Sequence, residues 1–210
     1  MKIFFKQRAK YEKIQMQKDK YGSTHFHEIA EAGDLQECKS IIYNIKDKNP
    51  KDTYGYTPLH RAANNGHYEV CKLIINSVEN KNPRSNSGIT PLHWAAEEGH
   101  LSVCQLIVNN CVDRNPKNGI EMTPFHIAAK NGHFEVCKLF IDNVEDKNPM
   151  ADFLSPLHLA AYKGHFEICK MIIDKIENKN LHGKGHTLTP LDYAIKFGHH
   201  QIADYIRSKI

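Results

Sequence analysis

The chain has 210 residues, of which 40% are apolar and 25% are charged, and its formal net charge is +4. This composition is typical of a folded globular domain and differs from that of a disordered chain. No apolar run approaches the roughly 20 residues that cross a bilayer, so a membrane-spanning chain is not expected.

The first 23 residues form a basic segment that differs from the rest of the chain. They contain seven of the 28 Lys and Arg residues but two of the 24 acidic residues. We expect residues 1–23 to be a solvated leader, either a tail or a short capping helix, before a nearly neutral body. The apolar run Ile3-Phe4-Phe5 is shorter than the about 7 to 15 residues of a secretory signal. A cytoplasmic location is therefore expected, with the nucleus as the alternative.

From Thr24 onward, one phrase recurs with a period of about 33 residues. A weak first copy, "THFHEIAEAGD", begins at Thr24, and five stronger copies begin with Thr or Ser followed by Pro. Successive copies start about 33 residues apart. The exceptions are the fifth copy, which begins one position early, and the sixth copy, which regains that position. The stronger copies begin at Thr57, Thr90, Thr123, Ser155 and Thr189.

The local chemistry of one copy predicts a pair of helices. Thr57 suits an N-cap and Pro58 suits the first helical turn, where a missing N–H costs nothing. Gly66 can adopt the left-handed conformation that ends a helix. A second apolar-faced helix is predicted from Tyr68 to about Ser77, followed by a finger-like loop. One such pair cannot bury its apolar face alone, so neighbouring copies must stack.

With T-P-L-H at its start, this period resembles the ankyrin repeat, and the resemblance covers residues 24–210. It implies an all-α fold, an α-solenoid of stacked helix-turn-helix repeats with protruding β-turn fingers. The polar second helix of the last copy is consistent with a terminal cap, so we expect a complete, monomeric domain. The six repeats are assigned to residues 24–56, 57–89, 90–122, 123–154, 155–188 and 189–210.

The chain departs from the family pattern where the second helices and the fingers end. β-Branched residues resist a left-handed cap, so we expect these helices to end differently or to run longer. The fourth finger has Glu121 where glycine is expected, and the fifth finger is one residue short. The glycine that usually ends the second helix is replaced by Ile45, Val78, Cys111, Val144 and Ile176.

A basic residue follows three positions after each of these replacements, where the family usually has valine. Stacking would align these residues into a basic ladder. With Asp47, Asp113 and Asp146 beside it, the ladder is either an ion-paired ridge or a site for an anionic partner. The ladder residues are Lys48, Lys81, Arg114, Lys147 and Lys179.

The six cysteines and fourteen histidines follow the repeat and do not have the spacing of zinc ligands. Five cysteines recur once per copy on the buried face of the second helix, so they are expected to be structural and reduced. The resemblance implies that the T-P-L-H histidines bond back to the Thr or Ser, or to neighbouring loop backbone. We expect no metal, no cofactor and no enzymatic activity. The recurring cysteines are Cys38, Cys71, Cys104, Cys137 and Cys169.

The resemblance implies a protein-protein interaction module, an adaptor, scaffold or inhibitor, that binds a protein or peptide partner through its finger and first-helix surface. No nucleic acid partner is expected. The alternative is an ankyrin arm or fragment of a larger protein such as an ion channel, kinase or toxin. Trp94 fills a position usually held by leucine, so its role is either packing or binding. The candidate protein-binding residues are Thr53, Tyr54, Tyr56, Asn64, Asn65, Asn86, Ser87, Ile89, Trp94, Glu97, Glu98, Ile120, Met122, Lys130, Asn131, Phe153, Leu154, Tyr162 and Lys163.

Overall fold

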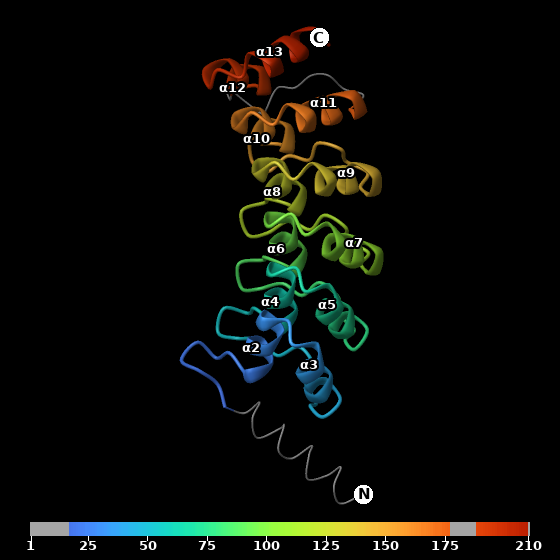
Figure 1. The fold of residues 1–210 in the computed structure, drawn as a ribbon. Helices are drawn as coiled ribbons and strands as arrows, with labels where there is room; N and C mark the ends of the chain where they lie inside the picture. Colours follow the sequence, from blue (N-terminus) through green and yellow to red (C-terminus); the bar gives the residue numbers. More distant parts are fainter. Residues whose placement is uncertain (1–16, 177–187, 210) are drawn as a thin grey trace, which may run out of the picture. The chain divides into compact units, whose positions relative to one another are not determined.

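The computed structural model describes residues 17–176 and 188–209, which contain twelve helices and no β-strand (Figure 1). The predictions for residues 1–16 and for the sixth finger, including Lys179, lie outside these residues. No helix in the described ranges is long and apolar enough to cross a membrane. The helices are α2 His25–Ala32, α3 Leu35–Ile42, α4 Pro58–Asn64, α5 Tyr68–Ile75, α6 Pro91–Glu97, α7 Leu101–Asn110, α8 Pro124–Asn131, α9 Phe134–Asn143, α10 Pro156–Lys163, α11 Phe166–Lys175, α12 Pro190–Lys196 and α13 His200–Arg207.

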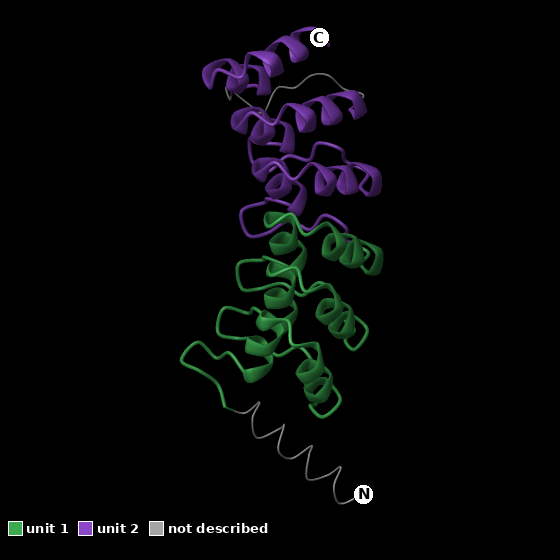
Figure 2. Ribbon diagram, viewed as in Figure 1, with its two compact units in different colours: residues 1–112 green, residues 113–210 purple. Residues whose placement is uncertain are grey.

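The chain divides into two compact units, Met1–Val112 and Asp113–Ile210, where the sequence analysis assigned one domain (Figure 2). In unit 1, the first helices α2, α4 and α6 pack side by side, and the second helices α3, α5 and α7 form an adjoining layer. Unit 2 repeats this arrangement with α8, α10 and α12 against α9, α11 and α13. Each unit is a solenoid of three helix pairs, which confirms the predicted all-α fold.

A histidine turn starts each of the first five repeats. In the second repeat, the Thr57 N–H donates to His60 Nδ1 at 3.1 Å, while the prolyl residue occupies the first helical turn. His60 Nε2–H donates to the Ile89 carbonyl of the next finger at 3.1 Å. The buried ring therefore caps its own helix and holds the following finger, as the resemblance implied. In the sixth repeat, Asp192 replaces histidine and accepts from the Thr189 N–H and hydroxyl, both at 2.8 Å.

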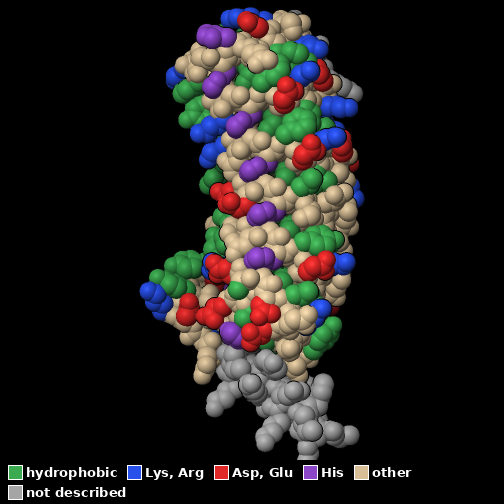
Figure 3. Space-filling view, viewed as in Figure 1, with side chains coloured by type: hydrophobic (Ala, Val, Ile, Leu, Met, Phe, Trp, Pro, Cys, Tyr) green, Lys and Arg blue, Asp and Glu red, His purple; other side chains and the backbone are tan. Residues whose placement is uncertain are grey.

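Within each unit, a second set of histidines ties a helix pair to the pair before it. In unit 1, His67 Nε2–H donates to the Glu31 carbonyl at 2.9 Å. In unit 2, His165 Nε2–H donates to the Lys130 carbonyl at 3.1 Å, and its ring lies against Gly132. Figure 3 shows histidine side chains in a row along one face of each unit. These bonds fix the register between neighbouring repeats of the same unit.

The second helices end without glycine, as predicted, and lysine takes part in ending two of them, α5 and α9. The C-cap residue of α9, Val144, is extended rather than left-handed, and the same holds for α7 and α11. α5 ends at Ile75, two residues before the predicted end. Lys81 Nζ donates to the Ile75 carbonyl, and Lys147 Nζ donates to carbonyls at the end of α9. An ammonium there satisfies exposed carbonyls and complements the helix dipole.

This finding gives the basic ladder a role that the sequence analysis did not consider. The ammonium groups of Lys81 and Lys147 are directed at helix ends, and Arg114 donates to the Asn143 carbonyl at 3.5 Å. Asp47 and Asp146 each accept from the backbone N–H two residues later, at 3.1 and 3.0 Å. Both charge types therefore serve local backbone geometry at the base of the fingers.

The recurring cysteines lie in the core, as predicted. All five are at most 1% exposed, whereas Cys111 is half-buried, and none of the six forms a disulfide. Burial raises the pKa of Cys38, Cys71, Cys104 and Cys169 to about 12, because a thiolate is poorly solvated in an apolar core. These thiols act as small apolar groups.

Two glycines offer a matched test of the contact between repeats. Gly132 and Gly198 have similar positive φ values, 83° and 75°, so alanine at either position costs roughly 1 to 2 kcal/mol of backbone strain. A Cβ on Gly132 would lie 2.6 Å from His165 Cε1, whereas a Cβ on Gly198 would meet nothing within 4 Å. We expect Gly132→Ala to lower the free energy of unfolding by about 1 kcal/mol more than Gly198→Ala, because the His165 bond is also lost. Urea denaturation of both variants measures this difference, and equal losses would contradict it.

Stability should fall as the pH falls below 6.5. Burial lowers the pKa of His27, and lowers those of His60, His126 and His158 to about 3, 4 and 4, below the 6.5 of an unfolded histidine. The unfolded chain therefore takes up protons first, and each histidine can contribute up to about 1.4 kcal/mol per pH unit. The stabilisation is complete above pH 6.5 and is lost progressively toward pH 4. Urea midpoints at pH 8.0, 7.0, 6.0 and 5.0 should show a plateau and then a decline. A midpoint independent of pH from 7 to 5 would contradict this assignment.

Candidate functional site

The structure places the predicted contact residues on finger tips and first helices of both units. In unit 1 the exposed members are Thr53, Tyr54, Asn65, Asn86, Ser87, Glu97 and Glu98, and the half-buried members are Tyr56, Asn64, Ile89 and Trp94. In unit 2 the exposed members are Ile120, Lys130, Asn131, Phe153 and Lys163, and the half-buried members are Met122, Leu154 and Tyr162. Each unit therefore has its own surface.

Four aromatic side chains gather on unit 1, and we call Tyr21, Tyr54, Tyr56 and Trp94 the aromatic cluster. Ring centroids are 6.3 Å apart between Tyr21 and Tyr54, and 6.5 Å apart between Tyr54 and Tyr56. The Tyr56 and Trp94 rings approach to 4.4 Å. Tyr21 is 45% exposed and Tyr54 is 54% exposed, so the outer half of the cluster faces solvent. The inner half is fixed by packing.

A buried aspartate holds the inner half of the cluster in place. Asp52 Oδ1 accepts from the backbone N–H groups of Tyr54 and Tyr56, both at 2.9 Å, which closes the finger. Its Oδ2 accepts from the Arg61 guanidinium at 3.3 Å, and the Asp52 side chain is fully buried. Arg61 Cζ lies 5.9 Å from the Tyr56 centroid and 5.8 Å from that of Trp94, within the range of a cation-π interaction.

Backbone and side-chain bonds join the fingers of unit 1. The Thr53 N–H and hydroxyl donate to the Tyr21 carbonyl at 2.9 and 2.7 Å. The Asn86 N–H donates to the Tyr54 carbonyl at 2.9 Å, and its side-chain amide donates to the Thr53 carbonyl at 3.0 Å. Asn65 similarly donates to the Glu31 carbonyl at 2.7 Å. Several predicted contact residues therefore also hold repeats together, and they present the aromatic cluster on a fixed support.

Sequence reasoning missed Tyr21, Asp52 and Arg61 as members of this site. The repeat contained a signal for Tyr21, which lies one full period before Tyr54. Asp19 likewise precedes Asp52 by one period, and its Oδ1 accepts from the Tyr21 and Ser23 N–H groups at 2.8 Å. Residues 19–23 therefore form a first finger, inside the segment that the sequence analysis treated as a leader.

Unit 2 presents a second group of aromatic side chains on its first helices. The Tyr162 and Phe197 centroids lie 4.6 Å apart, nearly perpendicular, and Tyr193 lies 6.0 Å from Tyr162 and 6.4 Å from Phe197. Phe197 remains 45% exposed. In the fourth finger, Glu121 adopts the left-handed conformation with φ of 61°, at the position where the family pattern has glycine. Asn118 braces that finger through the N–H groups of Ile120 and Met122.

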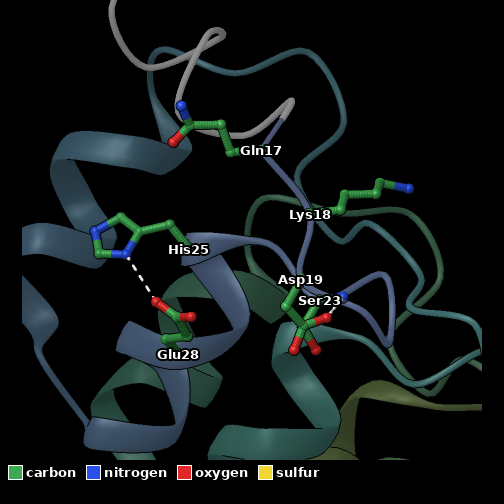
Figure 4. A pocket seen from close by; sticks show the side chains of 6 residues that line it. All are labelled: Gln17, Lys18, Asp19, Ser23, His25 and Glu28. Carbon is green, nitrogen blue, oxygen red and sulfur yellow. Dashed lines mark hydrogen bonds and ion pairs between the residues drawn. The ribbon is translucent and has the colours of Figure 1, made fainter.

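A polar pocket lies at the start of α2 and is lined by Gln17, Lys18, Asp19, Ser23, His25 and Glu28 (Figure 4). His25 Nδ1 lies 3.2 Å from Glu28 and its Nε2 lies 3.0 Å from Glu37. Burial lowers the pKa of His25, but the hydrogen bonds to Glu37 and Glu28 outweigh it and raise the pKa above 6.5. The ring thus bridges two carboxylates and joins α2 to α3, so these contacts assign it a structural role.

The described ranges contain no group of three His, Cys, Asp or Glu side chains arranged to hold a metal ion. The buried histidines His27, His60 and His126 donate and accept within the turns described above. The features suited to recognition in the described residues are therefore the aromatic surfaces and the charges around them.

Comparison with protein families agrees with this architecture. A model described as ankyrin repeats, three copies, matches at residues 6–85, 26–117, 76–151, 99–182 and 125–210. A comparison with curated proteins finds no match. The overlapping family matches span nearly the whole sequence and coincide with the stacked helix pairs and their histidine turns. The chain belongs to the ankyrin repeat family.

Proposed function

We propose that this chain is a non-enzymatic module that binds a protein partner, with the aromatic cluster of unit 1 as its main anchor. Ankyrin repeats are generally protein-protein interaction modules. The observation that carries the proposal is the pair of exposed rings, Tyr21 and Tyr54, which rest on half-buried Tyr56 and Trp94. The adaptor, scaffold and inhibitor roles all use such a surface.

The aromatic cluster combines rigid support with amphipathic side chains. Tyrosine offers a large apolar face and a hydroxyl while losing little rotamer freedom on binding. The bonded fingers and the Asp52–Arg61 pair hold the rings before a partner arrives, so little ordering is needed on association. Interfaces typically depend on a few such anchors, surrounded by contacts of small effect.

The buried reduced cysteines suit the reducing cytoplasm or nucleus, and we propose that the module acts there as a monomer. The proposal applies equally if these residues serve as the ankyrin arm of a larger protein such as an ion channel, kinase or toxin. In each case the partner contacts the fingers and first helices.

A selection experiment with a matched tyrosine control tests the proposal. Peptides recovered from a displayed random library against the full chain are titrated against wild type, Tyr21→Ala, Tyr54→Ala and Tyr43→Ala. We expect the first two substitutions to weaken binding by about tenfold or more, because an aromatic anchor contributes about 2 kcal/mol. Tyr43 is 71% exposed as the C-cap residue of the second helix α3 and is not a member of the aromatic cluster, so Tyr43→Ala should leave the affinity unchanged.

Thermal unfolding of the three variants provides the folding control, because none of these tyrosines is buried. Tyr56 is not used, since its packing against Trp94 would mix binding with stability. The proposal is wrong if the recovered binders tolerate both Tyr21→Ala and Tyr54→Ala, or if Tyr43→Ala weakens them equally.

A further inference from the structure

The first helices of unit 2 end in a regular row of lysines. Lys130, Lys163 and Lys196 follow one another at intervals of one repeat period, each in the last turn of its helix. Because α8, α10 and α12 pack side by side, the three positions lie on the same edge of the unit. All three side chains are exposed. We call these three residues the lysine strip.

The helix dipole alone does not account for the strip. A cation is favourable at any helix C-terminus, by about 0.3 to 1 kcal/mol at the surface. The same repeat positions in unit 1 hold Glu31, Asn64 and Glu97, although their helices have the same polarity. The fold therefore accepts acidic, neutral and basic residues at this position, and the three lysines are a property of unit 2.

The lysine strip has little acidic charge beside it on its own helices. α8 and α10 contain no Asp or Glu, and the one acid of α12, Asp192, caps Thr189 at the opposite end of that helix. In the fourth finger, Glu121 pairs with Lys117 at 2.6 Å. The first-helix ends of unit 2 therefore present excess positive charge.

Aromatic rings lie directly beside two of the lysines. Lys163 Nζ is 4.8 Å from the Tyr162 centroid, and Lys196 Nζ is 5.8 Å from that of Phe197. The rings contact one another and Tyr193, so they form a firm apolar floor beside the ammonium groups. An exposed ring next to a positive charge suits a ligand that carries both apolar and acidic groups.

We propose that the lysine strip and the aromatic rings of Tyr162 and Phe197 bind an acidic peptide segment that contains an aromatic or large aliphatic residue. The apolar residue packs on the rings, and carboxylates at neighbouring positions pair with the three ammonium groups. This inference rests on the proposed function in naming a peptide partner, but it uses a different surface from the aromatic cluster of unit 1.

The test begins from the full chain carrying Tyr21→Ala and Tyr54→Ala, so that binding at the unit 1 cluster does not contribute. Random peptides of uniform length are selected against this protein, and recovered sequences are titrated against it. We expect enrichment of Asp and Glu together with Phe, Trp or Leu. Raising the salt concentration from about 50 to about 300 mM should weaken binding by about tenfold or more, because exposed ion pairs are screened.

A matched pair of triple variants then locates the surface. Lys130→Gln, Lys163→Gln and Lys196→Gln, made together, should weaken the acidic peptides by about tenfold or more. Lys138→Gln, Lys170→Gln and Lys175→Gln change the net charge equally at exposed positions of α9 and α11, and should weaken binding by less than about twofold. Thermal unfolding shows whether both triple variants fold. The salt series is a second test of the lysine strip that does not depend on the folding of these variants.

The proposal is overturned if the selection shows no acidic enrichment, or if the two triple variants lose affinity equally. It is also overturned if a single-stranded DNA oligonucleotide or inorganic phosphate binds the lysine strip more tightly than the peptides do. If no recovered peptide depends on Tyr21 or Tyr54, while acidic peptides still depend on the lysine strip, the proposed anchor in unit 1 is contradicted and this inference stands. The converse result would contradict this inference alone.

Discussion

The histidine turn is the interaction on which the rest of the structure depends. One buried imidazole accepts the N–H of its own N-cap residue and donates to the carbonyl of the next finger, as His60 does for Thr57 and Ile89. Each nitrogen has a fixed role, because only the tautomer with hydrogen on Nε2 satisfies both partners. The same group that starts a helix therefore also determines where the next finger leaves the core.

The candidate site follows from this constraint. Tyr56 lies one residue before the N-cap Thr57, its carbonyl accepts from His27, and its ring contacts both His60 and Trp94. The position of the finger, and of the aromatic cluster that it carries, is thus tied to two successive histidine turns. Solvent-exposed rings gain a rigid base without contributing much to the core themselves. A recognition surface can then vary in sequence while the scaffold stays the same.

The sequence predicted the scaffold well because each repeat has the same local chemistry. The caps, the left-handed glycines and the core cysteines all follow from a period that five prolines mark clearly. The first finger was missed because residues 19–23 lack the Thr-Pro signature, although Asp19 and Tyr21 match Asp52 and Tyr54 at the period. The capping role of Lys81 was also missed. Its ammonium group bonds to a carbonyl six residues earlier in the chain, and a pattern of charges in the sequence does not indicate which backbone group a lysine contacts.

The candidate surface was less predictable for a physical reason. Finger positions could be assigned by register, but the contact of Trp94 with Tyr56, and the place of Arg61 beneath both, depend on stacking between repeats. Exposure also differs between residues at similar finger positions, since Tyr54 is exposed while Tyr56 is half-buried. The regular spacing of the three lysines can be read from the sequence. Their suitability as a binding surface depends on the aromatic rings beside them and on the helix bounds that leave α8 and α10 without acids.

The most direct test of the histidine turn is the tautomer and titration of the buried imidazoles in the folded chain. Long-range nitrogen-proton correlation by NMR reports which ring nitrogen carries the hydrogen. Our account predicts hydrogen on Nε2 and a bare Nδ1 for His27, His60 and His126. It also predicts no protonation of His60 and His126 between pH 7 and 5.5, and a pKa below 6.5 for His27. Hydrogen on Nδ1, or titration near pH 6.5, would contradict the account.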